Sequence, residues 1–290
     1  MTQEDWLADR FQEHRPRLRS VAYRMLGSLS EADDAVQDAW LRASRGGAND
    51  VDNLGGWLTT IVARVCLNML RSRNRRREES LEDRLPDPVV SAYDQTPPEE
   101  QVLLADSVGL ALLVVLDTLT PAERLAFVLH DMFELPFDEI APMVDRSPEA
   151  TRQLASRARR RVRGAEVPAP DPDLGRQRDV VDAFFRAVRG GDLDALVAVL
   201  HPDVVVRQDF SDTRPVRVLR GATAVASRTR AAPGAEAWPV MVNGAAGAVV
   251  TIRGRPFAVL GFTVRGDRIV EIDTIFGAER VGRIASAVLG

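Results

Sequence analysis

The chain has 290 residues, with 38 basic and 42 acidic side chains and a formal net charge of −4. This length predicts two or three domains, and the charge excludes a uniformly basic nucleic-acid coat but allows local basic patches. The single cysteine, Cys66, excludes an internal disulfide framework, and the three histidines lack metal-ligand spacing, so we expect a cytoplasmic protein without cofactor or metal. No membrane contact is expected either, because the apolar run 108–116 is too short to cross a bilayer.

Apolar side chains with helical spacing predict three helices in the first third of the chain. Residues 4–26 form the first, which Pro16 would kink or break. Ser30 is expected to cap the second, over 30–43, with Asp33 completing a weaker form of the capping box. The outer face of this second helix is acidic, which suits either a solvated face that complements the helix dipole or a partner-binding face.

The third predicted helix runs from Leu54 to about Glu79, after a loop rich in Gly, Asn and Asp. Polar side chains recur at about one-turn spacing opposite its apolar stripe: Thr60, Arg64, Asn68 and Arg71. The helix ends with five arginines between residues 71 and 77, a concentration of positive charge that suits contact with phosphates.

Residues 80–105 contain four prolines, several acids and little periodicity, and we interpret them as a linker stiffened at its X-Pro steps. One segment of this linker is more apolar than a passive spacer needs: Leu85, Pro86, Asp87 and Pro88, followed by Val89 and Val90. That composition indicates that the segment docks on another surface.

Helical signals return after the linker and end in a helix with a polar outer face. Thr120, Pro121 and Glu123 predict a capping box, followed by a short helix near 136–144 and a tight turn. The final helix, 147–163, is expected to bury Ala150, Leu154 and Ala158 and to expose Ser147 at its N-cap, Arg152, Gln153, Ser156, Arg157 and Arg160. This is the helix-turn-helix arrangement, whose second helix reads bases in the major groove. An Arg-rich helix end can also be only a solvated face.

After a second proline-rich linker, 165–175, the pattern changes to helices followed by strands. Two amphipathic helices are expected between residues 178 and 200, and strands between 201 and 277. The Arg265–Arg268 turn is expected to join two of these strands in a hairpin. Residues 176–290 are therefore predicted to form an α+β domain.

Three phrases give the helical part of the chain a family resemblance: RLRSVAYRMLGSLSEADDAVQDAWLRA, GWLTTIVARVCLNMLRSRNRRR and LTPAERLAFVLHDMFELPFDEIAPMVDRSPEATRQLASRARRRV. In order and spacing they resemble an RNA polymerase sigma factor of the extracytoplasmic-function (ECF) type. The resemblance implies a multi-domain fold, with two all-α sigma domains, sigma-2 and a helix-turn-helix sigma-4, before the α+β domain. The implied boundaries are 1–79 for sigma-2, 80–105 for the first linker, 106–164 for sigma-4, 165–175 for the second linker and 176–290 for the C-terminal domain.

The resemblance also implies two partners: core RNA polymerase, through the coiled coil of its largest subunit and its flap, and promoter DNA. The polymerase contact would use Asp33, Asp38 and Trp40. The −10 element would be melted and read by the loop that precedes the third helix and by Asn53, Thr60, Arg64, Asn68 and Arg71. The −35 element would be read by Ser147, Arg152, Gln153, Ser156, Arg157 and Arg160, with the arginines of 159–163 mostly on phosphates.

The phrases AFFRAVRGGDLDALVAVLHPDVVV and FTVRGDRIVEIDTI resemble the SnoaL-like, or NTF2-like, fold, in which a curved sheet closes into a cone. A sigma core with this extension resembles the SigJ-like, ECF41-type group, whose linker carries a Trp-Leu-Pro-Glu-Pro-like motif where this chain has Arg84–Pro88. Segments 211–215 and 276–280 stand where the group has two tail signatures, and both depart from them. The resemblance implies that the tail regulates the sigma domains in cis by packing on sigma-2, sigma-4 or the linker, with Leu85, Pro86, Asp87 and Pro88 as the regulatory linker.

The sequence leaves three alternatives open. In the first, the tail is a catalytic module of the isomerase or cyclase kind; we expect no enzyme activity, and the acid–base candidates are His201, Asp203, Asp209 and Asp273. In the second, it binds a small-molecule ligand in an apolar pocket lined by Phe257, Phe262, Val264 and Ile275. In the third, the chain is a helix-turn-helix regulator that binds DNA without polymerase.

Overall fold

The computed structural model describes residues 3–46, 51, 53–80, 84–93, 109–165, 168, 170–211 and 215–289. These residues form two compact units. A helical unit contains the described residues up to Ser80 and from Leu113 to Ala165, and a C-terminal unit contains 84–93, 109–112 and those from 168 onward. Within the described ranges, no helix is long and apolar enough to cross a membrane.

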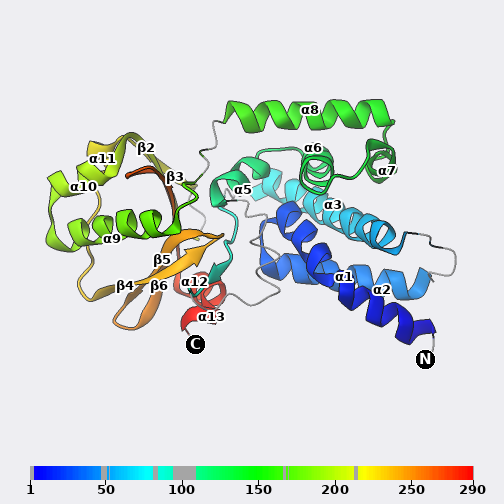
Figure 1. Ribbon diagram of the computed structural model, residues 1–290, viewed down its shortest axis with the longest axis horizontal. Helices are drawn as coiled ribbons and strands as arrows, with labels where there is room; N and C mark the ends of the chain where they lie inside the picture. Colours follow the sequence, from blue (N-terminus) through cyan, green and yellow to red (C-terminus); the bar gives the residue numbers. More distant parts are fainter. Residues whose placement is uncertain are drawn as a thin grey trace. The chain divides into compact units, whose positions relative to one another are not determined.

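The first part of the helical unit is a bundle of α1 (Gln3–Leu26), α2 (Leu29–Gly46) and α3 (Leu54–Ser80), drawn in blue and cyan in Figure 1. Its centre is formed by fully buried side chains, among them Leu18, Val21, Ala39, Leu58 and Val62. α1 continues through Pro16, so the kink or break expected there does not end the helix. A proline removes one N–H from the helix, and the packing of α1 on α2 and α3 compensates for that loss.

The start of α2 differs from the prediction. The helix begins at Leu29, and the Oγ of Ser28 accepts a hydrogen bond of 3.5 Å from the N–H of Glu31, so Ser28 rather than Ser30 is the cap. Asp33 completes no capping box, because its carboxylate accepts two hydrogen bonds of 2.7 and 3.0 Å from Arg19 in α1. An ion pair between helices takes the place of the local contact.

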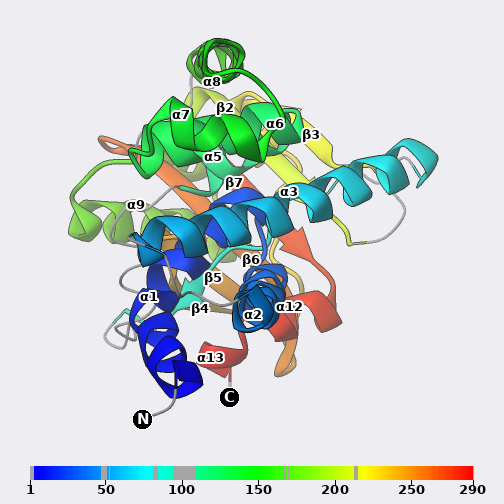
Figure 2. The ribbon, with the colours of Figure 1, turned by 90° about the vertical axis from the view of Figure 1, so that its right-hand side faces the viewer.

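The chain from Leu110 to Gly164 folds into short helices: α5 (Leu110–Asp117), α6 (Pro121–Phe127), the π-helix η1 (Val128–Met132), α7 (Phe137–Ile140), the 3-10 helix η2 (Ala141–Met143) and α8 (Pro148–Gly164). The capping box predicted for α6 is confirmed, because the N–H of Thr120 donates to the Glu123 carboxylate at 3.1 Å and Glu123 N–H donates to Thr120 Oγ1. The N-cap predicted for α8 is also confirmed, since Ser147 Oγ accepts from the N–H of Ala150 at 3.2 Å. α8 packs on α6 and α7 and is seen nearly end-on in Figure 2.

The C-terminal unit contains a seven-stranded sheet in the order β1-β4-β5-β6-β7-β2-β3. Its strands are β1 (Val90–Ser91), β2 (Leu200–Asp209), β3 (Arg217–Arg220), β4 (Ala235–Val242), β5 (Ala245–Ile252), β6 (Arg255–Arg265) and β7 (Arg268–Phe276). Only β2 and β7 pair in parallel among the described neighbours. The predicted hairpin joins β6 and β7, and Gly266 in its turn has a φ of 61°, which glycine adopts without strain.

The helices of this unit are α9 (Leu174–Gly190), α10 (Leu193–Val199), α11 (Ala222–Ala226), α12 (Ala278–Ile284) and α13 (Ser286–Leu289). α9 lies across one face of the sheet (Figure 1), and Phe184, Leu196, Phe262, Val264 and Ile272 form the core between helices and strands. The predicted fold class, two all-α domains and a C-terminal α+β domain, is confirmed. The edge strand β1 comes from the segment interpreted as a linker, which brings that segment into this unit.

Candidate nucleic-acid interface and linker contact

The outer face of α8 presents the polar side chains that the sequence singles out. Its exposed residues include Arg152, Gln153, Ser156, Arg157 and Arg160. The opposite face buries Thr151, Ala155 and Ala158, so the buried stripe is shifted by one residue from the predicted Ala150 and Leu154, which are half-buried. The hydroxyl oxygen of Ser147 is occupied as the N-cap, although the residue itself is exposed.

Two other arginines of α8 are engaged inside the helical unit. Arg159 Nε lies 2.5 Å from the Asp131 carboxylate, and an Arg161 guanidinium nitrogen lies 2.8 Å from Glu123. These ion pairs tie α8 to η1 and α6. Arg159 and Arg161 therefore help to hold the helix in place, and the phosphate contact expected for them stays a prediction, since the side chain of Arg161 is still 50% exposed.

Three of the five residues predicted for the −10 element share one exposed face of α3: Arg64, Asn68 and Arg71. The other two act at the start of the helix. Asn53 Oδ1 accepts a hydrogen bond of 2.9 Å from Gly56 N–H, and the half-buried Thr60 donates its hydroxyl to the Gly56 carbonyl at 2.9 Å. Most of the loop that precedes Asn53, residues 47–50 and 52, lies outside the described residues.

One arginine of the basic end of α3 is used for packing. Arg73 donates to the Leu26 carbonyl at 3.0 Å and to Asp117 at 3.1 Å. Asp117 also accepts from Arg124, whose side chain is 2% exposed and whose Nε donates to the Arg24 carbonyl at 3.1 Å. This buried network joins α3 and α1 to α5 and α6, and sequence patterning alone did not reveal it because its members are far apart in the chain.

The predicted polymerase-binding residues lie on α2. Asp33 is paired with Arg19, Asp38 with Arg42 at 2.8 Å, and the half-buried Trp40 ring lies 5.0 Å from that of Phe11. Leu41, which is 45% exposed on the same helix, was not among the predicted residues. Helical spacing places Leu41 on the outer face with Asp34, Gln37 and Asp38, which is the signal that could have identified it.

A cluster of charged contacts in the C-terminal unit holds the predicted linker. Asp209, at the end of β2, accepts a hydrogen bond of 2.9 Å from Leu85 N–H and one of 2.6 Å from Arg280 in α12. Arg280 also donates to Asp87 at 2.6 Å and to the Leu85 carbonyl at 2.5 Å. We call these four residues, Leu85, Asp87, Asp209 and Arg280, the linker clamp.

Three of the four residues of the linker clamp are buried, and Asp87 is half-buried. Asp209 is 1% exposed and Arg280 is 8% exposed. Burial alone would lower the pKa of Arg280, but Asp87 and Asp209 outweigh it and raise this pKa above its ordinary value. The guanidinium therefore stays charged, and both carboxylates find the donors that a buried charge requires.

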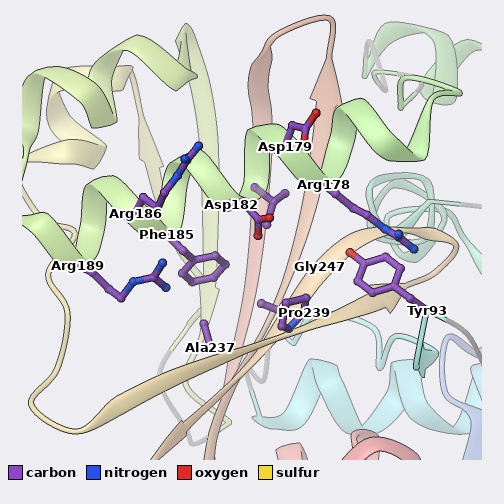
Figure 3. Close-up of a pocket in the computed structure, with 12 residues that line it drawn as sticks. Tyr93, Arg178, Asp179, Asp182, Phe185, Arg186, Arg189, Ala237, Pro239 and Gly247 are labelled. Carbon is purple, nitrogen blue, oxygen red and sulfur yellow. The ribbon is translucent and has the colours of Figure 1, made fainter.

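The remaining linker residues continue the contact along the sheet. Val89 N–H donates to Asn243 Oδ1 at 2.7 Å, and β1 pairs with Val242 and Met241 of β4. Figure 3 shows the ring of Tyr93 against the guanidinium of Arg178, which lies 3.6 Å from the ring centroid. The predicted docking of this segment is thus confirmed, on the tail, even though residues 276–280 depart from the family signature.

The acid–base candidates of the catalytic alternative are not gathered in a cavity. His201 Nδ1 accepts a hydrogen bond of 3.2 Å from Asp203 N–H at the entrance of β2. Asp209 belongs to the linker clamp, and Asp273 is paired with Arg207 at 3.1 Å. None of the four is among the described residues that line two cavities of this unit, one of about 550 Å³ and one of about 400 Å³.

The apolar pocket expected in the C-terminal unit is present with a different lining. A cavity of about 400 Å³ lies between α9, α11 and the sheet. Phe257 lines it as predicted, whereas Phe262 and Val264 belong to the core and Ile275 is 1% exposed and absent from the described lining. The C-terminal unit therefore contains a cavity large enough for a small molecule and, separately, a site that holds the linker segment.

Two family models match the chain: Sigma-70 region 2 over residues 10–76 and Sigma-70, region 4 over residues 109–162. The ECF RNA polymerase sigma factor SigJ of Mycobacterium tuberculosis is 43% identical over 218 residues, which cover 74% of this chain and 69% of SigJ. The chain belongs to the ECF RNA polymerase sigma factors. The predicted sigma-2 and sigma-4 folds of this sigma factor are thereby confirmed.

Two further comparisons extend the likeness. The probable ECF sigma factor SigI of Mycobacterium tuberculosis is 39% identical over 207 residues, which cover 70% of each chain. The crystal structure of Mycobacterium tuberculosis SigJ matches 94% of this sigma factor and 97% of its own chain, with a TM-score of 0.75 and 33% identity. Because that match spans almost the whole chain, the C-terminal α+β unit is part of the fold that this sigma factor shares with SigJ.

Proposed function

We propose that this sigma factor brings core RNA polymerase to promoters with defined −10 and −35 elements, and that its C-terminal unit regulates this activity in cis. The sigma function follows from the family. The observation that supports the regulatory part is the linker clamp, in which Asp209 and Arg280 hold Leu85 and Asp87.

The exposed face of α8 suits the −35 element. Arginine and glutamine there match the donor and acceptor patterns of guanine and adenine in the major groove. The side chains available for this are Arg152, Gln153, Ser156, Arg157 and Arg160. Ser147 keeps its hydroxyl proton while its oxygen caps α8, so it can donate to a phosphate at the helix N-terminus.

The −10 element fits the exposed face of α3. Arg64 and Arg71 supply positive charge along a strand backbone, and Asn68 between them supplies a base-reading amide. Asn53 and Thr60 act as positioning residues, because their hydrogen bonds set the first turns of the helix.

The outer face of α2 is the proposed contact with the coiled coil of the largest polymerase subunit. Asp38 lies there together with the exposed Leu41, while Asp33 and Trp40 lie at the border of this face, in contact with Arg19 and Phe11 of α1. An apolar side chain with acids around it resembles the usual anatomy of an interface, with a desolvated centre and a polar rim. The flap of the polymerase is the proposed partner of the sigma-4 helices.

The proposed DNA-binding helices, α3 for the −10 element and α8 for the −35 element, are called the two DNA readers below. Holding the linker limits the distances that the two DNA readers can adopt. The C-terminal unit holds residues 84–93 by the clamp, by β1 and by Tyr93. An extended residue spans about 3.3–3.6 Å, so fixing this segment removes roughly 30 Å from the adjustable reach between α3 and α5. Promoter recognition needs both elements at once, and the clamp therefore acts on promoter choice.

The test is transcription in vitro with core polymerase. The full chain is compared with a chain ended at about residue 167 and with the Asp87→Asn variant. We expect both changes to alter promoter-dependent transcription, and the matched control Arg220→Gln, an exposed arginine of β3, to leave it unchanged. Identical activity of all four proteins would refute the regulation, and a lack of promoter-specific initiation by the full chain would refute the sigma function.

A further inference from the structure

The cavity of about 400 Å³ in the C-terminal unit has a volume that holds small organic ligands. Its wall is formed by α9, α11 and the strands from β2 to β7. Promoter recognition and polymerase binding, as assigned above, make no use of this space. Its lining therefore needs a separate explanation.

The wall is rich in aromatic rings: Phe184, Phe185, Phe210, Phe257 and Phe276. The rings of Phe210 and Phe276 are stacked, with centroids 5.0 Å apart and planes at 6°. Phe257 meets Phe276 edge-on at 5.4 Å and is 40% exposed. A ring left open to water beside a stacked pair is a surface that a flat apolar molecule would cover favourably.

The charge of the lining is positive. The described part of the lining contains four arginines and one carboxylate, a net charge of +3 in a chain of net charge −4: Arg189, Arg217, Arg228, Arg230 and Glu236. Two guanidinium groups are positioned by backbone carbonyls, Arg228 by Ala224 at 3.2 Å and Arg230 by Thr229 at 2.8 Å. These hydrogen bonds orient the cations without neutralising them, so they can still pair with an anion.

The aromatic and cationic groups lie on the same side of α9. Figure 3 draws an adjoining cavity, and in it Phe185 and Arg189 project from α9 in the direction of Ala237 on β4. These three residues also line the cavity of about 400 Å³. A ligand there would meet apolar rings and guanidinium groups together. That combination selects a molecule with an aromatic body and an acidic group over a neutral one.

The cavity wall is continuous with the linker clamp. Phe210 directly follows Asp209, and Phe276 comes just before α12, which carries Arg280. The Oγ of Ser211 donates to the Phe276 carbonyl at 2.5 Å and accepts from Arg280 at 3.2 Å. The stacked rings and the clamp thus share two short segments of chain.

We propose that this cavity binds an organic carboxylate with an aromatic body and that its occupancy is coupled to the linker clamp. The regulatory meaning of the coupling rests on the cis regulation proposed above, whereas the binding does not. The sigma factor would then respond to a small molecule through the linker between its two DNA readers.

Calorimetric titration of the full chain with 2-naphthoate tests the ligand class, with 2-naphthamide as the uncharged match of the same shape. We expect saturable binding of one naphthoate per chain and at least about 10-fold weaker binding of the amide, because the amide cannot form charge-assisted hydrogen bonds with arginine. Equal affinities would overturn the anion preference, and the absence of saturable naphthoate binding would overturn the site.

The location is tested by substitutions in the wall. Leu260→Trp fills the cavity, and Ala235→Trp obstructs it from β4 should the first variant fold poorly; each is expected to abolish binding. Arg217→Gln combined with Arg228→Gln should weaken naphthoate binding about 10-fold, while Arg220→Gln, on β3 outside the described lining, should not. Unchanged affinity in the folded tryptophan variant would place the binding elsewhere.

The coupling is tested by reciprocity. Asp87→Asn removes a clamp contact and touches none of the cavity, so it should shift naphthoate affinity by roughly 5-fold if the two are coupled. Unchanged affinity contradicts the coupling. If Asp87→Asn alters transcription but naphthoate does not bind, the cavity proposal is refuted and the cis regulation stands. If naphthoate binds but Asp87→Asn leaves transcription unchanged, the cis regulation is refuted and the ligand site stands.

Discussion

Arginine serves opposite purposes in the linker clamp and on the outer face of α8. Arg280 is 8% exposed and is bound by Asp87, Asp209 and the Leu85 carbonyl. Arg157 and Arg160 are exposed on a helix face that suits the major groove. All 38 basic side chains of the chain are arginines, so residue type carries no information here. Burial and nearby carboxylates separate an arginine that holds the chain together from one that is available to DNA.

The same distinction holds within single helices. On α8, Arg159 and the half-exposed Arg161 are paired with Asp131 and Glu123, one or two residues from Arg157 and Arg160. On α3, Arg73 joins Asp117, whereas Arg64 and Arg71 are exposed. A run of arginines therefore contains both kinds, and substitutions can distinguish them.

The largest effect is expected from Arg280→Gln. It leaves Asp209 buried without its cation, which typically costs about 3–5 kcal/mol of the free energy of unfolding. Pulsed hydrogen exchange of β2 and β7 across a urea series measures this for the C-terminal unit. Arg157→Gln, an exposed residue, should change stability by no more than about 0.5 kcal/mol. Similar losses of unfolding free energy in Arg280→Gln and Arg157→Gln would contradict the difference proposed between the linker clamp and the outer face of α8.

A second buried arginine contact predicts a pH dependence. Burial raises the pKa of Asp273 to about 6, helped by Glu271 and opposed by Arg207. Between about pH 4 and 6 the native state therefore keeps a proton that the unfolded chain has lost, so stability falls as pH rises through this window. The fall should be on the order of 2 kcal/mol and absent in Asp273→Asn, as measured by urea unfolding at pH 4, 5 and 6. Parallel pH curves for the two proteins would contradict the raised pKa.

The third expected effect concerns the affinity for DNA. Arg157→Gln should weaken the complex of the polymerase holoenzyme with its promoter by about 1–3 kcal/mol, with relaxed preference at one −35 position. Arg160→Gln should reduce the salt slope of binding by about 1 if it contacts a phosphate. Arg159→Gln, whose charge is paired with Asp131, should keep the slope of the parent. If Arg159→Gln changed the salt slope as much as Arg160→Gln, the ion pair with Asp131 would not distinguish a structural arginine from one that binds DNA.

Local signals in the sequence predicted the parts of this molecule that depend on neighbours along the chain. The capping box of Thr120 and the N-cap of Ser147 are contacts over three residues, and the exposed faces of α3 and α8 follow from helical spacing. The cap of α2 was misplaced because Ser28 and Ser30 both fit the motif. The difference was decided by Arg19, which takes Asp33 across two helices.

Contacts between distant segments were not predictable in this way. The linker half of the clamp, Leu85 and Asp87, was expected to dock because of its composition and the family motif. Its tail half, Asp209 and Arg280, was not, because these two residues lie far apart in the chain and the tail sequence departs from the family signature. Only Phe257 of the four residues predicted to line the cavity is in the described lining, because Phe262 and Val264 pack in the core and Ile275 is buried elsewhere; β6 carries register shifts against both of its neighbours. Alternation along a strand predicts two faces but not which face a bulge turns inward.

Dependence of transcription on the −10 to −35 spacing tests the role of the linker most directly. Templates based on a promoter mapped after overexpression, with spacers lengthened or shortened by single base pairs, are transcribed by core polymerase with the parent chain or with Asp87→Asn. A held linker predicts a narrow optimum for the parent and a broader one for the variant, with Arg220→Gln matching the parent. Equal spacer dependence for all three proteins would contradict a clamp that sets the distance between the two DNA readers.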